Sequence, residues 1–235
     1  MEMQKAVLYL GVDATHYNSK KPVIHMPLVS VEPRPIDSFE IRRIFSEVMN
    51  YSHIIFTSKT SVALFFSFLS QFGYGKNVLA GTHIIAVGQI TAYYLTKAGV
   101  SPTYIATDES QEGMIRTLAH FDLNQANILL PRSSSARPLL SHYLVEHGIR
   151  HQICTLYDMK KKRPYEIHDL SGIDEVVFTT ILSVDVFFEI YREIPHHVKL
   201  HPIGPLVRQR LRYFLHVHKT DHAHLLDEKT TAYAC

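Results

Sequence analysis

The sequence predicts an α/β protein made of two similar parallel-sheet units. Short apolar segments typical of strands alternate with amphipathic segments typical of helices, and motifs of the first half return in the same order in the second half. Because parallel strands need a crossover connection, which is usually a helix, this alternation favours βαβ units and a parallel sheet.

The predicted strands are short apolar segments bounded by polar or turn-forming residues. Those at 53–57 and 175–179 are near-continuous in Ile, Val and Phe, a pattern typical of strands covered on both faces. The full set of expected strands is residues 6–10, 23–31, 53–57, 83–87, 103–106, 127–130, 152–159, 175–179 and 199–203.

Helical patterns lie between these strands. Two stretches place apolar side chains on one helix face, at spacings of three and four residues. Their members are Val62, Phe65, Phe66 and Leu69 in the first stretch and Leu139, Leu140, Tyr143 and Leu144 in the second. Each stretch follows a predicted strand, as a crossover helix would.

The chain also resembles itself. HIIFTS at 53–58 resembles EVVFTT at 175–180, and IAVGQ at 85–89 resembles HPIGP at 201–205. The opening strand at 6–8 matches residues 128–130. Because three blocks recur at nearly one spacing, we interpret the chain as a duplicated α/β unit of about half its length.

Composition excludes several classes of protein. With 46% hydrophobic residues and a net charge of +2, the chain is neither disordered nor a general nucleic-acid binder, and no apolar run is long enough to span a membrane. Two cysteines, Cys154 and Cys235, are too few for a disulfide framework and fit a reducing compartment. The first residues do not resemble a signal peptide, so we expect a cytoplasmic protein.

Both repeated motifs place hydroxyls or glycine at the end of a strand and the start of a helix. Unpaired N–H groups at such a helix start favour anionic ligands. Thr57 and Ser58 occupy this position in the first half, and Thr179 and Thr180 in the second. Ordinary helix capping explains the same hydroxyls, and both interpretations stay open at this point.

The ordered motifs resemble those of the uroporphyrinogen-III synthase family, over nearly the whole chain. They are FTSKTSV at 56–62, AVGQITA at 86–92, GVSP at 99–102, ILLPRSSSAR at 128–137, LVEHG at 144–148, TLY at 155–157, FTT at 178–180 and IGP at 203–205. The second half departs from the family pattern, since Leu206 stands where a Thr usually follows Gly-Pro and Ile181-Leu182 follow the second hydroxyl pair.

The resemblance implies two α/β domains joined by a two-stranded extended linker, with a cleft between them. The expected domains are residues 1–32 with 165–235, and residues 36–160, with linkers at 33–35 and 161–164. Pro-containing, charged stretches at these linkers fit an extended backbone. A monomer whose domains move about the linker is expected.

The resemblance also implies a reaction. Enzymes of this family cyclise hydroxymethylbilane, a linear polycarboxylate tetrapyrrole, to uroporphyrinogen III with inversion of the last pyrrole ring and loss of water, using no cofactor or metal. The enzyme that makes the bilane is a candidate partner. Two other interpretations are a non-catalytic, two-lobed protein that binds a tetrapyrrole or another polyanion and a periplasmic-type solute binder, which the missing signal peptide disfavours.

Site residues follow from the matching motifs. Tyr157 is the expected proton donor to the departing hydroxyl; the alternative is a packed aromatic at a strand end. The expected substrate-binding residues are Thr57, Ser58, Thr91, Arg132, Thr180 and Gly204, with Lys59 as a further candidate.

Four other signals are better explained without chemistry. Gly73–Lys76 resembles a helix end more than a phosphate loop. The basic run at 160–163 is interpreted as a solvated linker, and Cys154 as a small buried hydrophobic residue. A cluster of histidines and aspartates near the end of the sequence is interpreted as a solvated helix and tail, so no metal site is expected. Its members are His196, His197, His201, His216, His218, His222 and His224, with Asp221 and Asp227.

Overall fold

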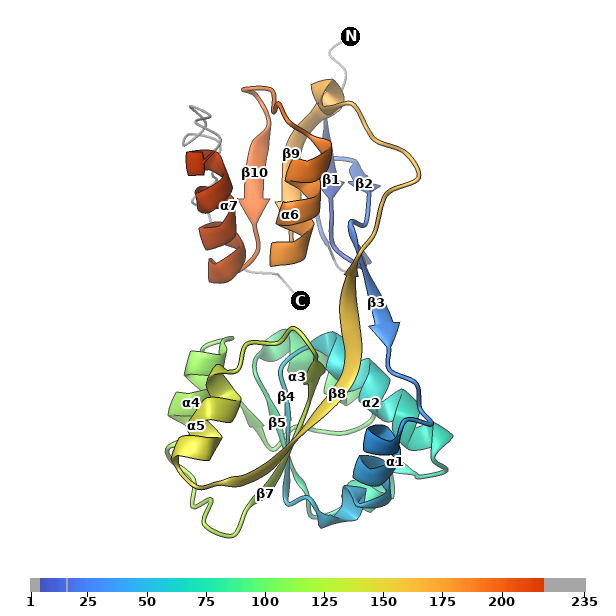
Figure 1. Cartoon of the computed structure of the whole chain (residues 1–235), viewed down its shortest axis with the longest axis vertical. Helices are drawn as coiled ribbons and strands as arrows, with labels where there is room; N and C mark the ends of the chain where they lie inside the picture. Colours follow the sequence, from blue (N-terminus) through green and yellow to red (C-terminus); the bar gives the residue numbers. More distant parts are fainter. Residues whose placement is uncertain (1–4, 16, 218–235) are drawn as a thin grey trace. The chain divides into compact units, whose positions relative to one another are not determined.

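The computed structural model describes residues 5–15 and 17–217 and has two sheets, in which most of the strand pairs are parallel (Figure 1). The described residues divide into two compact units: unit 1 comprises those up to Val31 and from Lys160 onward, and unit 2 is Glu32–Met159. The expected class, α/β with parallel sheets, is confirmed. The linker, the cleft and the domain boundaries given above stay predictions.

Unit 1 is built on a four-stranded sheet in the order β10-β9-β1-β2. Its strands are β1 (Ala6–Tyr9), β2 (Val23–His25), β9 (Ile173–Phe178) and β10 (Lys199–Pro202). Helices α6 (Ile181–Ile190) and α7 (Pro205–Val217) and the short η3 (Leu170–Gly172) complete it. Its core joins the central strands to both long helices through Leu8, Val176, Phe178, Phe187, Leu200 and Leu211.

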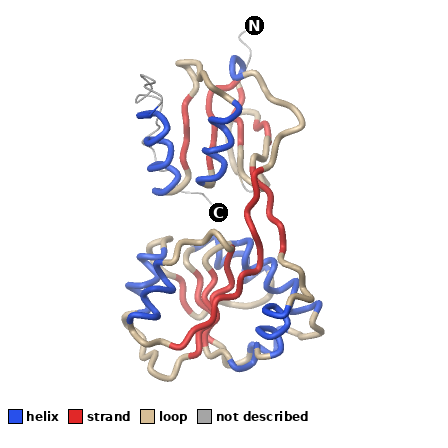
Figure 2. The backbone as a smooth tube through the Cα atoms, viewed as in Figure 1, coloured by secondary structure: helices blue, strands red, loops and turns tan. Residues whose placement is uncertain are grey.

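Unit 2 contains a six-stranded sheet in the order β3-β8-β7-β4-β5-β6 (Figure 2). Its strands are β3 (Val29–Pro33), β4 (His53–Phe56), β5 (His83–Ala86), β6 (Tyr104–Ile105), β7 (Asn127–Ser133) and β8 (Arg150–Lys161). The chain passes between the units within β3 and again within β8. The helices are α1 (Phe39–Ser46), α2 (Lys59–Gln71), α3 (Gln89–Lys97), α4 (Gln111–Leu118) and α5 (Leu139–Glu146), with short turns η1 (Val48–Asn50) and η2 (Lys76–Leu79).

Both faces of the unit 2 sheet are covered by helices. Alternate residues of a strand point to opposite faces, so neighbouring residues of β4 contact different helices. Ile55 in β4 packs in one cluster with Met114 of α4 and Leu140 of α5. On the other face the ring of Phe56 lies 5.3 Å from that of Phe65 in α2. Figure 1 accordingly shows α4 and α5 on the side of the sheet away from α1 and α2. Burial on both faces explains why this strand is apolar throughout.

The sequence repeat corresponds to a repeat of sheet topology. The resemblances pair β4 with β9, β5 with β10 and β7 with β1, and these strands stand in the same order, β5-β4-β7 and β10-β9-β1. In each sheet one more strand follows in this order: β8 lies next to β7, and β2 lies next to β1. The corresponding helices α2 and α6 follow directly after β4 and β9. The two halves therefore share an arrangement as well as a sequence pattern.

The prediction of one strand over 23–31 is wrong, because this segment is divided between two sheets. β2 ends at His25 and its partner strand β1 ends at Tyr9, and beyond them Met26 and Leu28 still donate to the Tyr9 and Leu10 carbonyls. The following residues form β3, which pairs with β8. None of the described helices has the length and apolar character needed to cross a membrane.

Candidate functional site

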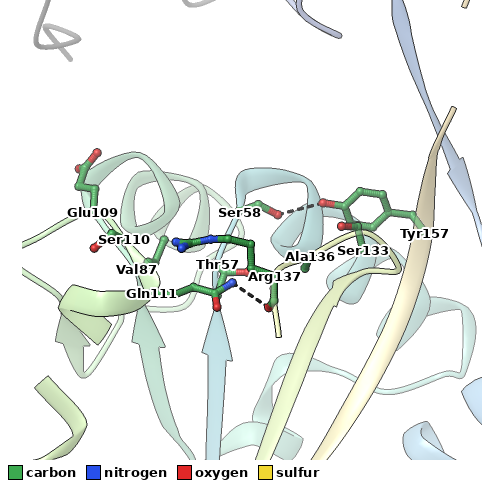
Figure 3. A pocket seen from close by; sticks show the side chains of 10 residues that line it. All are labelled: Thr57, Ser58, Val87, Glu109, Ser110, Gln111, Ser133, Ala136, Arg137 and Tyr157. Atoms are coloured by element: carbon green, nitrogen blue, oxygen red, sulfur yellow. Dashed lines mark hydrogen bonds between the residues drawn. The ribbon is translucent and has the colours of Figure 1, made fainter. Parts of the chain in front are cut away.

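A cavity of about 290 Å³ lies in unit 2, where the parallel strands β4, β5 and β7 end (Figure 3). This is the edge at which open α/β sheets bind ligands. The loops after these strands, the start of α4 and a residue of β8 supply its lining, which is Thr57, Ser58, Val87, Glu109, Ser110, Gln111, Ser133, Ala136, Arg137 and Tyr157. Most of these side chains are polar, so the cavity suits a ligand rich in hydrogen-bonding groups.

Ser58 both caps the start of α2 and lines this cavity. Its backbone is extended, and its side-chain oxygen accepts a hydrogen bond from the Ser61 N–H at 3.1 Å, which satisfies one of the free donors of the first turn. Its oxygen also lies 3.2 Å from the hydroxyl oxygen of Tyr157. The capping and ligand interpretations of this residue are therefore compatible.

Tyr157 reaches the cavity from β8 with its ring buried. An irregularity in the β7–β8 ladder, between Arg132 and Ser133, brings Ser133 opposite Tyr157. Such a bulge redirects side chains relative to a regular ladder, and here both Ser133 and Tyr157 face the cavity. In Figure 3 the Tyr157 hydroxyl points toward Ser58.

Arg137 and the first turn of α4 form a network that the sequence did not reveal. The two Nη atoms of Arg137 donate to the two carboxylate oxygens of Glu112, at 2.7 and 2.9 Å. The side chain of Gln111 donates to the Arg137 carbonyl (3.2 Å) and accepts from the Leu140 N–H (3.1 Å). The Arg137 guanidinium lowers the pKa of Glu112 to about 2, so this carboxylate is ionised at neutral pH.

Glu109 is a second feature absent from the sequence predictions. Its carboxylate accepts a hydrogen bond from the Gln89 N–H at 2.8 Å, at the start of α3. The N-cap residue of that helix, Gly88, has no side chain to do this. A Cβ at Gly88 would lie only 2.5 Å from the Glu109 side chain, so glycine leaves the space that Glu109 occupies. A carboxylate of the protein thus fills one anion-favouring position at the rim of the cavity.

Of the residues predicted for unit 2, the structure brings Thr57, Ser58 and Tyr157 together around the cavity. Thr91 is only 4% exposed and lies outside the lining. Arg132 of β7 lies in a smaller adjoining pocket and donates to the Ala136 carbonyl in the loop that follows this strand, and burial lowers the pKa of Arg132. The roles of Thr91 and Arg132 in ligand binding stay predictions.

The two candidate binding residues in unit 1, Thr180 and Gly204, each lie between a strand and the helix that follows it, as the sequence repeat predicts. Thr180 caps α6, its side-chain oxygen accepting from the Ser183 N–H at 3.0 Å, and so repeats the geometry of Ser58. Gly204 precedes α7 with a φ of 92°, in the left-handed region that favours glycine. Lys59, the first residue of α2, lies 5.6 Å from the centre of the Tyr94 ring and is not part of the cavity lining.

The other sequence signals do not form a reactive site in the described part of the chain. No group of three or more metal-ligating side chains is present among the described residues, while His218, His222, His224, Asp221, Asp227 and Cys235 lie outside them. Cys154 is fully buried, and burial raises the pKa of its thiol to about 12. Gly73 follows α2 with a φ of 79°, as expected for a left-handed residue ending a helix.

Comparison with known proteins gives one consistent result. The family model described as uroporphyrinogen-III synthase HemD matches residues 21–218. A curated relative, the putative uroporphyrinogen-III synthase of Methanothermobacter thermautotrophicus, is 24% identical over 196 residues, which cover 77% of each chain.

Solved structures with the same fold include two from bacteria. A mutant uroporphyrinogen III synthase from the extremely thermophilic bacterium Thermus thermophilus superposes with a TM-score of 0.60 at 17% identity, covering 97% of this chain and 94% of that one. The uroporphyrinogen-III synthetase of Helicobacter pylori gives a TM-score of 0.60 at 17% identity, covering 96% and 93% of the two chains. At these identities the superpositions establish similarity of fold alone.

Proposed function

The chain belongs to the uroporphyrinogen-III synthase family, and from this premise we propose that it cyclises hydroxymethylbilane to uroporphyrinogen III in tetrapyrrole biosynthesis. The match of the family model over residues 21–218 is the observation that carries this proposal. The finer parts of the proposal are inversion of the last pyrrole ring, loss of water as in a lyase, and action as a cytoplasmic monomer without metal or cofactor.

The cavity in unit 2 is proposed to hold part of the substrate. Its volume of about 290 Å³ is at the low end for small-molecule sites, so it accommodates a portion of a tetrapyrrole. The hydroxyls of Thr57, Ser58 and Ser133 provide hydrogen-bond donors for the acidic side chains of the bilane. Thr180 and Gly204, which belong to unit 1, are proposed to bind further carboxylates of the substrate.

The chemical task is mainly one of orientation. Hydroxymethylbilane can close directly to the uninverted isomer I, and the enzyme must hold the chain so that the substituted ring carbon is attacked instead. Holding reacting groups in a productive geometry can contribute several kcal/mol. A cavity with many fixed polar groups is suited to this task because it can restrict rotation of individual pyrrole rings.

Tyr157 is proposed to donate its proton to the departing hydroxyl, which leaves as water. A phenol is a weak proton donor, so its contribution is expected to be limited. The hydrogen bond to Ser58 supports this role, since it fixes the orientation of the phenol at the cavity wall. Loss of the hydroxyl leaves a cationic azafulvene, which the surrounding oxygen atoms can stabilise.

The deciding experiment is an isomer assay. Purified protein is mixed with freshly generated hydroxymethylbilane, and the products are oxidised to porphyrins and separated. Isomer III should predominate, whereas isomer I alone, formed at the enzyme-free rate, would contradict the proposal. A silent assay combined with calorimetric binding of uroporphyrinogen III would instead favour the non-catalytic alternative, which the departures at Ile181, Leu182 and Leu206 motivate.

A further inference from the structure

The loop between β7 and α5 carries two of the cavity residues, and the first turn of α4 holds this loop in place. Ala136 and Arg137 line the cavity from this loop, and Ser133 lines it from the end of β7. Gln111 bonds the loop at the Arg137 carbonyl and at the Leu140 N–H, and Glu112 binds the Arg137 guanidinium through both carboxylate oxygens. The backbone and the side chain of Arg137 are therefore both fixed from α4.

We propose that Arg137 binds a carboxylate of the substrate and that Glu112 and Gln111 are positioning residues, which aim the Arg137 guanidinium into the cavity. The inference rests on the proposed function for the identity of the ligand, a polycarboxylate tetrapyrrole. It adds a substrate-binding residue and the two residues that orient it.

The geometry of the guanidinium supports a second partner. Arginine has five N–H donors in a planar fork, and Glu112 uses one on each Nη atom. Three N–H groups therefore remain available for another oxygen ligand. Figure 3 shows the side chain extending from the loop across the cavity, between Thr57 and Ser110. A substrate carboxylate can bind there by charge-assisted hydrogen bonds.

The ion pair with Glu112 explains how a long, flexible side chain keeps this position. A two-point contact between guanidinium and carboxylate restricts orientation in a way that a single hydrogen bond does not. Since the pKa of Glu112 is held near 2, the contact persists throughout the neutral range. Arg132, at the end of β7, donates instead to the Ala136 carbonyl in the following loop.

The same helix offers a matched control. Arg116 of α4 forms an ion pair with Asp108, both side chains are 62% exposed, and neither residue lines the cavity. Arg116→Gln therefore removes one arginine and one ion pair from α4 without touching the proposed site.

The test measures the kinetic constants for hydroxymethylbilane and the thermal midpoint of unfolding. It compares the wild type with Arg137→Gln, Glu112→Gln, two double variants of this pair described below and the control Arg116→Gln. Arg137→Gln should raise KM about tenfold, the effect of losing hydrogen bonds to a charged group, and Glu112→Gln should raise it less, about threefold. Arg116→Gln should leave KM unchanged. Arg137→Gln with KM within about twofold of the wild type would overturn the proposal.

The reversed pair, Glu112→Arg with Arg137→Glu, separates substrate binding from a purely structural ion pair. It should recover much of the thermal stability lost in the single variants while KM stays raised, because a carboxylate now faces the cavity. Recovery of a normal KM would overturn the proposal. If the reversed protein does not fold, Glu112→Gln in the Arg137→Gln background decides: no further rise in KM supports positioning, and an additive rise contradicts it.

Failure of the proposed function can be told apart from failure of this inference. Calorimetry with uroporphyrinogen III under anaerobic conditions measures binding without turnover. If the wild type binds but does not cyclise, weaker binding by Arg137→Gln still supports the arginine site, and equal binding contradicts it. If the wild type neither cyclises nor binds, the carboxylate site is overturned together with the proposed function.

Discussion

The hydroxyl oxygens of Ser58 and Tyr157 lie 3.2 Å apart, although the residues are 99 positions apart in the chain. Ser58 follows β4 and Tyr157 belongs to β8, and β7 lies between these two strands in the sheet. The contact therefore spans a strand, and the irregularity at Ser133 in β7 brings Tyr157 opposite that residue. Two distant sequence motifs thus contribute to one wall of the cavity.

Tyr157→Phe should lower kcat about tenfold with a small change in KM, because it removes a modest proton donor and keeps the ring. The rate of isomer III formation measures this effect. Tyr51→Phe is the matched control: it also removes a phenol hydrogen bond, the one to Gln152 at 2.6 Å, but outside the cavity lining. An unchanged kcat in Tyr157→Phe would remove this residue from the mechanism.

Ser58→Ala and Thr180→Ala should each lower the free energy of unfolding by about 1 kcal/mol, since each removes the side-chain oxygen that caps a helix. Ser58→Ala should also lower kcat more than Thr180→Ala does, because it frees the Tyr157 hydroxyl. Urea unfolding and the isomer assay provide the two measurements. Equal losses of activity in the two variants would argue that only capping matters at Ser58.

Glu109→Ala should have opposite effects on stability and binding. The start of α3 loses its capping carboxylate, which costs about 1 kcal/mol. At the same time a negative charge leaves the rim of the cavity, so KM for a polycarboxylate substrate should fall about twofold to threefold. Glu109→Gln, which keeps an acceptor oxygen, should lower KM with a smaller loss of stability. A higher KM in both variants would contradict this account.

The sequence predicted the central strands well and the segment 23–31 poorly, for a physical reason. β4 and β9 are covered on both faces, so their residues are apolar throughout and the signal is strong. In the segment 23–31, Val23 and His25 are exposed, and a local pattern could not show that its two ends join different sheets. Only the positions of β1 and β8 in the folded chain decide that division.

The candidate site also contains some residues that the sequence predicted and others that it did not. Thr57, Ser58 and Tyr157 lie in motifs that could be recognised along the chain. Glu112 and Arg137 are 25 residues apart and meet only because α4 and α5 pack together. The one signal was Arg137 itself, within the ILLPRSSSAR motif, but its partner follows from tertiary packing rather than from spacing.

A final prediction concerns the opposite end of the unit 2 sheet, where β4 and β5 begin. His53 is buried, and its ring stacks on that of His83 with 4.9 Å between the ring centres. Burial, and to a lesser extent the neighbouring His83, lower the pKa of His53 from its ordinary value of 6.5. The unfolded chain therefore takes up a proton at His53 at a higher pH than the folded protein does.

Stability should consequently fall as the pH drops below about 6.5, because the unfolded state then binds more protons, and the contribution of His53 should be fully present above that pH. Urea unfolding at a pH of about 7.5 and at a pH of about 5.5 measures the slope. His53→Phe, which keeps a ring beside His83 but cannot be protonated, should reduce the pH dependence relative to the wild type. His53→Gln provides a second, smaller replacement should the phenyl ring fit poorly. If both variants kept the wild-type slope, the pH dependence would arise from other groups and the lowered pKa of His53 would not contribute to it.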